Sequence, residues 1–282
     1  SLGEGLRLFV MNEFTQFVSH IVAVNPGKTE TFGIGGLLNT TRPLSLQDAS
    51  AIAKLPNVEE VVPVVMGNAK IKAGQRGRYI DIAGVGGAAD KAWKLELELG
   101  SFLPADDLQR ARSFVVLGSK VREELFGTVN PVGDFVHIGG ARFRVIGVTA
   151  PKGEFLGTDL DDLVYIPAGK GMQLFNRQSL MEIDIFYNPR SSGEAMAAKI
   201  SKLLIDRHGF EDFTIVTQDQ VLSTMDNILS ILTFAGAGLG AISLLVGGVG
   251  ITTILMITVN ERITEVGLLR ALGGTVGQVR TL

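Results

Sequence analysis

The feature that most constrains this chain is an uncharged stretch near its C-terminal end. Between Asp226 and Glu261 lie 34 consecutive residues without a charge. A helix needs about 20 apolar residues to cross the roughly 30 Å of hydrocarbon in a bilayer. A helix buried in a soluble core usually stops sooner and keeps a polar face. We therefore expect residues 223–259 to form a stalk and a membrane-spanning helix.

The charges on the two sides of this stretch predict its orientation. Three arginines follow it, whereas the 20 residues before it contain one basic residue, Arg207, among four acidic ones. Positively charged residues accumulate on the cytoplasmic side of spanning helices. We therefore expect the C-terminus in the cytoplasm, and residues 1–226 on the far side of the membrane.

Small residues recur inside the stretch at the spacing of one helix turn. Gly236 and Gly240 are four positions apart, and so are Ser243 and Gly247. Such pairs let the backbones of two helices approach closely in a membrane. We interpret these four residues as helix-packing positions, which implies neighbouring helices from a longer chain or from a second copy.

The residues before the stretch have the pattern of an α+β domain. Two strand–helix–strand units are expected. The helix of the first unit begins at Ser45, with Asp48 three residues on as in a capping box, and the helix of the second begins at Ser192. Pro63 is expected to interrupt its strand or to place that strand at an edge. The strands and helices of these units are predicted at 17–24, 45–55, 58–66, 69–72 and 78–85, and at 181–187, 192–208 and 213–216.

A long β-rich segment separates the two units. Its residues 134–138 and 142–148 alternate and flank Gly139-Gly140, which is a signal for a hairpin with a type I′ turn. A strand at 114–117, a short helix at 119–126 capped by Ser119 and a strand at 163–166 complete it. We therefore expect one layer domain that is split in sequence around an insertion.

The composition argues against several kinds of chemistry. The chain has no cysteine and three histidines that are far apart in sequence, so neither thiolate chemistry nor a zinc site is expected. The cluster of Asp159, Asp161 and Asp162 lacks the pattern of a calcium loop. The net charge of −3 does not favour nucleic acid as a partner. No catalytic, metal or cofactor site is expected.

The residues that follow the uncharged stretch, 260–282, suggest a short amphipathic helix at the inner membrane surface. Arg262 and Glu265 are three positions apart, and Gly273-Gly274 would end the helix. The alternative is that this segment is simply the end of the spanning helix, with charged side chains reaching the interface.

The segment from Gly247 to Gly273 resembles the second membrane helix and the following coupling helix of the FtsX-like permease family. The resemblance consists of a Gly-Gly-x-Gly-Ile run followed by E-R-x-x-E-[IV]-G-x-x-[RK]-A-x-G. The upstream residues resemble the periplasmic core domain of MacB-type ABC transporters, in motifs whose order matches that family. These motifs are Val22–Gly27, Leu55–Val58, Val115–Gly118, Leu125-Phe126, Pro131-x-Gly133, Phe143–Val148 and Val164–Pro167.

The resemblance implies a division of the chain and a location. A porter-like layer domain would comprise residues 18–85 and 176–222, and a sabre-like β-rich insertion would comprise 86–175. Residues 1–17 would be a helical lead-in after a missing first membrane helix, and 260–282 a cytoplasmic coupling helix and the start of a missing permease remainder. The membrane would be the inner (plasma) membrane of a bacterium, with the domain in the periplasm or outside the cell.

The resemblance also implies partners and a mechanism. An ABC ATPase subunit or domain would bind ATP at the inner face, the permease would be a homodimer or a pair, and a periplasmic adaptor or an outer-membrane channel would be further partners. No cofactor is expected in this chain. ATP-driven motion would be transmitted mechanically to the outer domain, for export of a peptide, drug or lipoprotein-type cargo. The coupling residues would be Glu261, Arg262, Glu265, Gly267, Arg270, Ala271 and Gly273.

Two other functions remain open from the sequence. FtsX-like proteins also act as membrane scaffolds that regulate a cell-wall hydrolase without moving a substrate. A single-pass anchor or sensor would need nothing beyond the one helix and the outer domain.

Overall fold

The computed structural model describes residues 20–27, 42–105, 111–155, 158–273 and 277. The described residues divide into two compact units, one that ends at Ser223 and one that begins at Thr224. The predicted helical lead-in at 1–17, part of the first predicted strand and the end of the predicted coupling segment lie outside the described residues.

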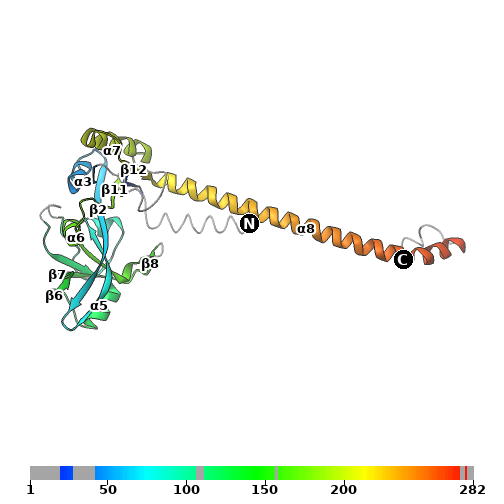
Figure 1. Cartoon of the computed structure of the whole chain (residues 1–282), viewed down its shortest axis with the longest axis horizontal. Coiled ribbons are helices and arrows are strands. Elements are labelled where there is room, and N and C mark those ends of the chain that lie inside the picture. The colour runs from blue at the N-terminus through cyan, green and yellow to red at the C-terminus, as the bar shows by residue number, and fades with distance from the viewer. Residues whose placement is uncertain (1–19, 28–41, 106–110, 156–157, 274–276, 278–282) are drawn as a thin grey trace. The chain divides into compact units, whose positions relative to one another are not determined.

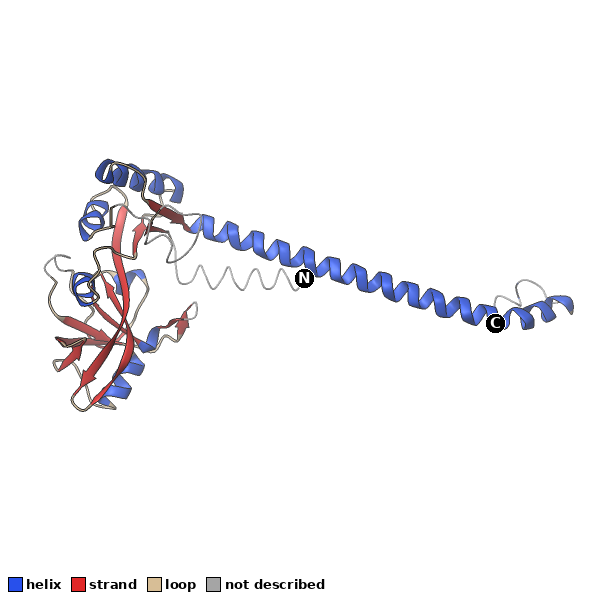
Figure 2. Ribbon diagram, in the orientation of Figure 1, coloured by secondary structure: helices blue, strands red, loops and turns tan. Residues whose placement is uncertain are grey.

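The first unit is built on one large mixed sheet (Figures 1 and 2). Its order is β12-β1-β11-β2-β3-β10-β5-β7-β4, and β6 pairs with both β2 and β7. The strands are β1 (Ile21–Pro26), β2 (Val58–Ala73), β3 (Arg76–Val85), β4 (Leu97–Gly100), β5 (Phe114–Leu117), β6 (Phe135–Ile138), β7 (Ala141–Thr149), β10 (Leu163–Pro167), β11 (Glu182–Tyr187) and β12 (Phe213–Thr217). A separate two-stranded sheet contains β8 (Glu154–Phe155) and β9 (Thr158–Asp159).

Helices cover parts of this sheet. They are α3 (Leu46–Ile52), α4 (Ala89–Ala92), α5 (Ser119–Phe126), α6 (Ala168–Leu174) and α7 (Gly193–His208), with a 3₁₀ turn, η1, at Leu160–Asp162. A last helix, α8 (Gln218–Ala271), begins in the first unit and continues through the second. The structure confirms the predicted α+β class.

Strands β12, β1, β11 and the first half of β2 form an antiparallel layer, called here the layer. Helices α3 and α7 cover one face of it (Figure 1). The helix α7 packs there through Met196, Ile200 and Leu204, which recur every four residues and are fully buried. Both predicted strand–helix–strand units, β1–α3–β2 and β11–α7–β12, are therefore confirmed.

The prediction for Pro63 is wrong, because β2 is continuous and lies between β11 and β3. The N–H of Met181 in the segment before β11 donates to the carbonyl of Val64, so the backbone of Val64 faces β11. By alternation the nitrogen of Pro63 faces the β3 side. There the ladder ends at the pair of Val64 with Val85, so the missing N–H of Pro63 costs no bond.

Six strands pair in a closed ring, β2-β3-β10-β5-β7-β6 and back to β2, called here the ring. Its interior is filled by buried aliphatic residues and Phe143. Gly139 and Gly140 have φ values of 56° and 91°, which confirms the predicted hairpin between β6 and β7. The second half of β2 belongs to the ring and the first half to the layer, so a single strand runs through both parts.

A third cluster of apolar residues lies on the opposite sides of these strands. It joins Val62 and Val64 of β2, Tyr165 of β10 and the segment from α4 to Leu103, which the sequence analysis had not assigned. The start of α5 also differs from its prediction, because Gly118 precedes the helix and Ser119 is its first residue, without a side-chain cap. Gly118 packs against the carbonyls of Asp161 and Leu163, where a side chain would not fit.

Candidate functional site

All predicted functional residues lie on or directly after α8, which is one uninterrupted helix of 54 residues. At about 1.5 Å per residue this helix is roughly 81 Å long. Its last turn ends at Ala271, and Gly273 follows with a φ of 93°. The predicted short helix within 260–282 is therefore not a separate element, because α8 continues through Glu261 and Arg262 without a break.

The start of α8 carries a capping box that the sequence analysis missed. The Thr217 hydroxyl accepts a bond from the N–H of Gln220, and the Gln220 side chain accepts one from the N–H of Thr217. The Gln218 side chain accepts a further hydrogen bond from the N–H of His20, just before β1. The Thr-x-x-Gln pattern is a local signal for this cap, whereas the stalk was predicted to begin at residue 223.

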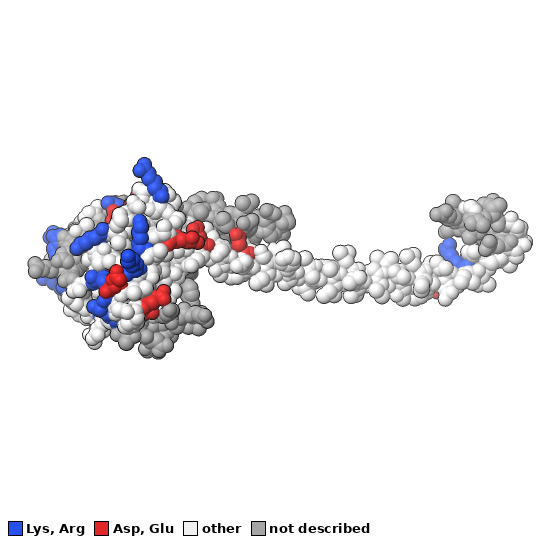
Figure 3. Space-filling model, turned by 90° about the horizontal axis from the view of Figure 1, so that it is seen from above, with Lys and Arg blue, Asp and Glu red and all other residues white. Residues whose placement is uncertain are grey.

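The apolar part of α8 is exposed along the described chain. The part of α8 from Gln218 to Leu268 is long and apolar enough to cross a membrane, and its most apolar residues are not buried. Phe234 and Leu244, for example, are 78% and 79% exposed. Figure 3 shows the uncharged surface along this helix. A helix in the core of a soluble protein would bury these apolar side chains.

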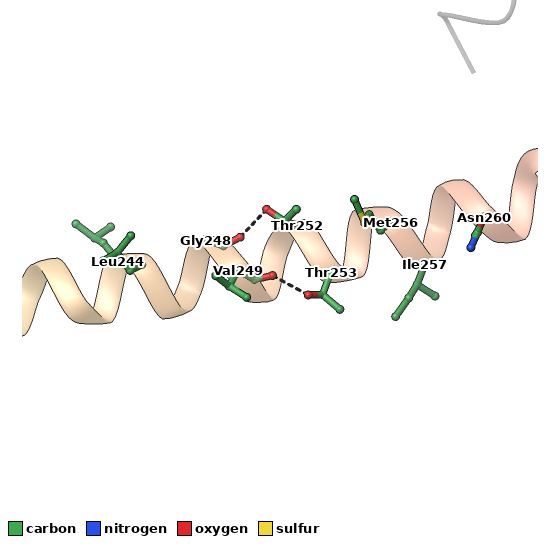
Figure 4. Close-up of a pocket in the computed structure, with 9 residues that line it drawn as sticks. Leu244, Gly248, Val249, Thr252, Thr253, Met256, Ile257 and Asn260 are labelled. Atoms are coloured by element: carbon green, nitrogen blue, oxygen red, sulfur yellow. Dashed lines mark hydrogen bonds between the residues drawn. The ribbon is translucent and has the colours of Figure 1, made fainter.

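Five polar side chains in this apolar part form hydrogen bonds within the helix. Five hydroxyl groups each donate to the carbonyl oxygen four residues before, and they belong to Thr233, Ser243, Thr252, Thr253 and Thr258. Figure 4 shows two of these bonds, from Thr252 to Gly248 and from Thr253 to Val249. A hydroxyl bonded in this way needs no water, so the helix suits a hydrocarbon environment.

The predicted packing residues share one side of α8. At about 100° per residue, Gly236, Gly240, Ser243 and Gly247 fall within about 40° of one line along the helix. A Cβ atom added at any of these three glycines would meet nothing within 4 Å. The geometry therefore leaves a smooth, open stripe on which a second backbone could lie.

Another side of α8 is lined by larger residues. Leu244, Val249, Met256 and Ile257 border a hollow there, together with Thr252 and Asn260 (Figure 4). Its described walls all come from this one helix, so the hollow is a surface feature of the helix rather than a closed cavity.

The predicted coupling residues occupy the last turns of α8. Glu261, Arg262, Glu265, Gly267, Arg270 and Ala271 are helical, and Gly273 lies two residues beyond the end. Glu261 and Glu265 are one turn apart, on the same side of the helix as the stripe of small residues. Both carboxylates and Arg262 are exposed.

Among the residues that the structure describes, no group of three or more potential ligands could hold a metal ion. A buried charged network does exist in the layer, and the sequence analysis missed it. Asp48 of α3 accepts a bond of 2.6 Å from Arg207 Nε, and its second oxygen is 3.3 Å from His208 Nε2. His208 Nδ1 is 2.7 Å from Asp212 Oδ1.

This network has a structural role in the fold. Burial acts to raise the pKa of Asp48, but hydrogen bonds from Ser45, Arg207 and His208 outweigh it, and the pKa is lowered from its usual value. The network joins α3, α7 and the loop before β12, and its members are far from α8 in sequence. No feature of it suggests a substrate site.

Comparisons with known proteins agree with the family resemblance. A family model described as the MacB-like periplasmic core domain matches residues 1–203. The macrolide export ATP-binding/permease protein MacB of Hyphomonas neptunium is 32% identical across 100% of this chain and 44% of its own length. The pyoverdine export ATP-binding/permease protein PvdT of Pseudomonas entomophila is 30% identical across 97% of this chain and 41% of its own. The chain thus spans less than half the length of these relatives.

Solved structures support the fold. The periplasmic region of MacB from Actinobacillus actinomycetemcomitans matches with a TM-score of 0.64 at 21% identity, covering 77% of this chain and 98% of that one. The extracellular domain of the ABC-type transporter YknZ from Gram-positive bacteria matches with a TM-score of 0.57 at 18% identity, covering 70% of this chain and 100% of that one.

Proposed function

Because the chain belongs to the family of MacB-like periplasmic core domains, we propose that it is part of the permease of an ABC exporter in a bacterial inner membrane. The observation that carries the proposal is the extent of the similarity: export proteins align with 97–100% of the chain, through the core domain and α8 alike. In this proposal α8 spans the membrane, residues 1–226 lie outside and Glu261 onward lies in the cytoplasm.

The proposed mechanism is mechanical transmission along α8. ATP would be bound and hydrolysed by a partner ATPase domain, whose motion displaces the coupling residues from Glu261 to Gly273. The helix is continuous from this segment to Gln218. Its roughly 81 Å exceeds the roughly 30 Å of hydrocarbon. The displacement would therefore reach Gln218, where the capping box of Thr217 and Gln220 fixes the helix start to β12.

The proposed assembly pairs two permeases through the stripe of small residues, Gly236, Gly240, Ser243 and Gly247. For the cargo, two relatives are named for the export of macrolides and of pyoverdine. We propose a drug-like cargo, with peptides and lipoprotein-type cargo as alternatives. A periplasmic adaptor and an outer-membrane channel belong to the proposal as further partners. The relatives named above are exporters, so the comparisons do not favour the hydrolase-regulating scaffold.

The test is to change the coupling residues in the complete protein that contains this chain. Glu265→Lys and Arg270→Glu are expected to leave ATP hydrolysis measurable while macrolide efflux from cells falls about tenfold or more, because the charges that engage the ATPase are reversed. Thr264→Ala, in the same turn but outside the coupling set, is the matched control and should export normally. Export at the normal rate in both charge-reversal variants would contradict the transmission mechanism.

A further inference from the structure

Two carboxyl groups lie side by side on one face of β11. Asp184 is only 7% exposed, and Glu182 precedes it by two residues, so both side chains leave the strand on the same face. Ile183 and Ile185 point to the other face, into the core beneath α3 and α7. The carboxyl pair, Glu182 and Asp184, therefore stands among the apolar residues of the opposite face.

The neighbours of the carboxyl pair on the adjacent strands provide no positive charge. Asp184 lies opposite Ala23 of β1 and Val62 of β2, and Glu182 lies opposite Val64. Glu60 of β2 forms an ion pair with Lys91, whose Nζ lies 3.7 Å from Glu60 Oε1. On α4, Asp90 adds another acidic group, with one carboxylate oxygen buried and unpartnered. Across the described chain, no lysine or arginine forms an ion pair with Glu182 or Asp184.

The two side chains instead lie next to each other on one face of β11, and the charge of Glu182 contributes to the raised pKa of Asp184. Asp184 Oδ2 also accepts a hydrogen bond of 3.2 Å from the indole Nε1 of Trp93. Two ionised carboxylates on neighbouring positions of one strand face in an apolar setting would repel strongly, and neither could be solvated without a rearrangement.

Trp93 links the carboxyl pair to the ring. Lys152, in the segment after β7, donates from Nζ to the carbonyl of Trp93 at 2.5 Å and to the carbonyl of Lys94 at 2.8 Å. The indole of Trp93 reaches β11 of the layer, and its backbone is held by a residue that follows a strand of the ring. Trp93 therefore contacts both the carboxyl pair and the segment that follows β7.

We propose that Glu182 and Asp184 hold one shared proton, and that its release at alkaline pH loosens the contact of Trp93 with β11, making the core domain responsive to pH. When the proton leaves, Glu182 turns toward solvent, since it is the less buried of the two, and Asp184 remains charged beside Trp93. Burial and the charge of Glu182 raise the pKa of Asp184 to about 8, against the opposing hydrogen bond from Trp93. Burial also raises the pKa of Glu182.

The chain provides its own reporter for this event, because Trp93 is its single tryptophan. The experiment is a fluorescence titration of the 282-residue chain in detergent micelles, excited at about 295 nm to select tryptophan, between about pH 5 and 9.5. The emission of the unmodified chain is expected to change in one transition with a midpoint near 8. Asp184→Asn is expected to abolish the transition.

Two further variants keep the test decisive if Asp184→Asn fails to fold. Glu182→Gln removes the repulsive charge and offers a donor to Asp184, so the midpoint is expected to fall by at least about one pH unit. Asp81→Asn changes an exposed carboxylate on β3 and is the matched control, which should keep the midpoint. A chain without any transition in this range, or a midpoint that Glu182→Gln leaves in place, would overturn the proposal. The test needs no transport, so it is independent of the proposed function.

Discussion

At the scale of single residues, two of the buried aspartates in the core domain, Asp48 and Asp184, differ in their expected charge. Asp48 is 3% exposed and stays charged because Ser45, Arg207 and His208 surround it with donors. Asp184 has one indole donor and an acidic neighbour, so it keeps a proton instead. The number and charge of the donors around each carboxyl group decide its state.

The contribution of Asp48 can be measured by removing its charge. Asp48→Asn leaves Arg207 and His208 without their buried partner and weakens the capping box at Ser45. We expect the free energy of unfolding to fall by about 3 kcal/mol, because breaking a buried ion pair from one side strands the other charge. Urea unfolding of the chain in micelles, followed by far-UV circular dichroism, would measure the loss.

The pH dependence of this contribution has a defined sign. Because the pKa of Asp48 is lower in the folded state than its usual 3.8, its contribution is present above about pH 4 and is lost as the pH falls further. The difference in stability between the unmodified chain and Asp48→Asn should therefore shrink in acid. Asp81→Asn, at an exposed site, should stay within about 0.5 kcal/mol of the unmodified chain. If Asp48→Asn lowered the free energy of unfolding by no more than this amount, the network would not be stabilising.

Contacts between residues close in the sequence could be predicted, whereas contacts between residues far apart in the sequence could not. The capping box of Ser45 and Asp48 was predicted because its two partners are three residues apart. The bond from Arg207 to Asp48 joins positions 159 residues apart. For the carboxyl pair, the alternating sequence predicted the strand but not the burial of the two side chains. That burial depends on β1, β2 and Trp93 together. No local pattern encodes such a partner.

At the scale of elements, the sequence predicted the strands and helices that have a periodic pattern of apolar residues. The two strand–helix–strand units and the hairpin at Gly139-Gly140 follow from alternation, caps and turn residues. The helix α6 and the strand β4 were missed because their positions depend on packing against other strands, not on a local sequence pattern. The closure of the ring by β6 on β2 is likewise a tertiary contact.

The stripe of small residues on α8 makes a prediction about association. Gly240→Ile places a branched side chain where a second backbone would lie, so we expect pairing of the chain in lipid vesicles to weaken about tenfold. Energy transfer between labelled copies would measure it. The domain fold should not change, because a Cβ atom at Gly240 meets nothing within 4 Å.

The control for this change is on the same helix. Gly238→Ile adds the same volume, also in open space, but about 200° around the helix from Gly236. It should leave the pairing intact. Equal weakening by both variants would indicate a general effect of volume and remove the stripe as the packing surface.

At the scale of the whole molecule, the charge-free stretch was the most reliable signal, because 34 residues exceed what a buried core helix requires. Its continuation as one helix through Ala271 agrees with the alternative that the segment after the stretch is the end of the spanning helix, and not with a separate short helix. The orientation of the chain rests on three arginines after the stretch, and it stays a prediction.

That orientation can be tested with single cysteines, because the chain contains none of its own. Tyr79→Cys places a thiol on β3 at a position 70% exposed, and Leu272→Cys places one after the end of α8 at a position 79% exposed. With a maleimide that cannot cross membranes, we expect Tyr79→Cys to react in cells whose outer barrier has been removed. We expect Leu272→Cys to react only after the inner membrane is broken, because positive residues keep that end in the cytoplasm.

Leu245→Cys, in the middle of the charge-free stretch, is the control for the span itself. Its position is 70% exposed in the chain, yet in hydrocarbon its thiol would not ionise and should stay unreactive in both conditions until detergent is added. Labelling of Leu272→Cys without lysis, with Tyr79→Cys protected, would reverse the orientation. Labelling of all three positions without lysis would mean that α8 does not cross the membrane, and the exporter proposal would then lose its physical basis.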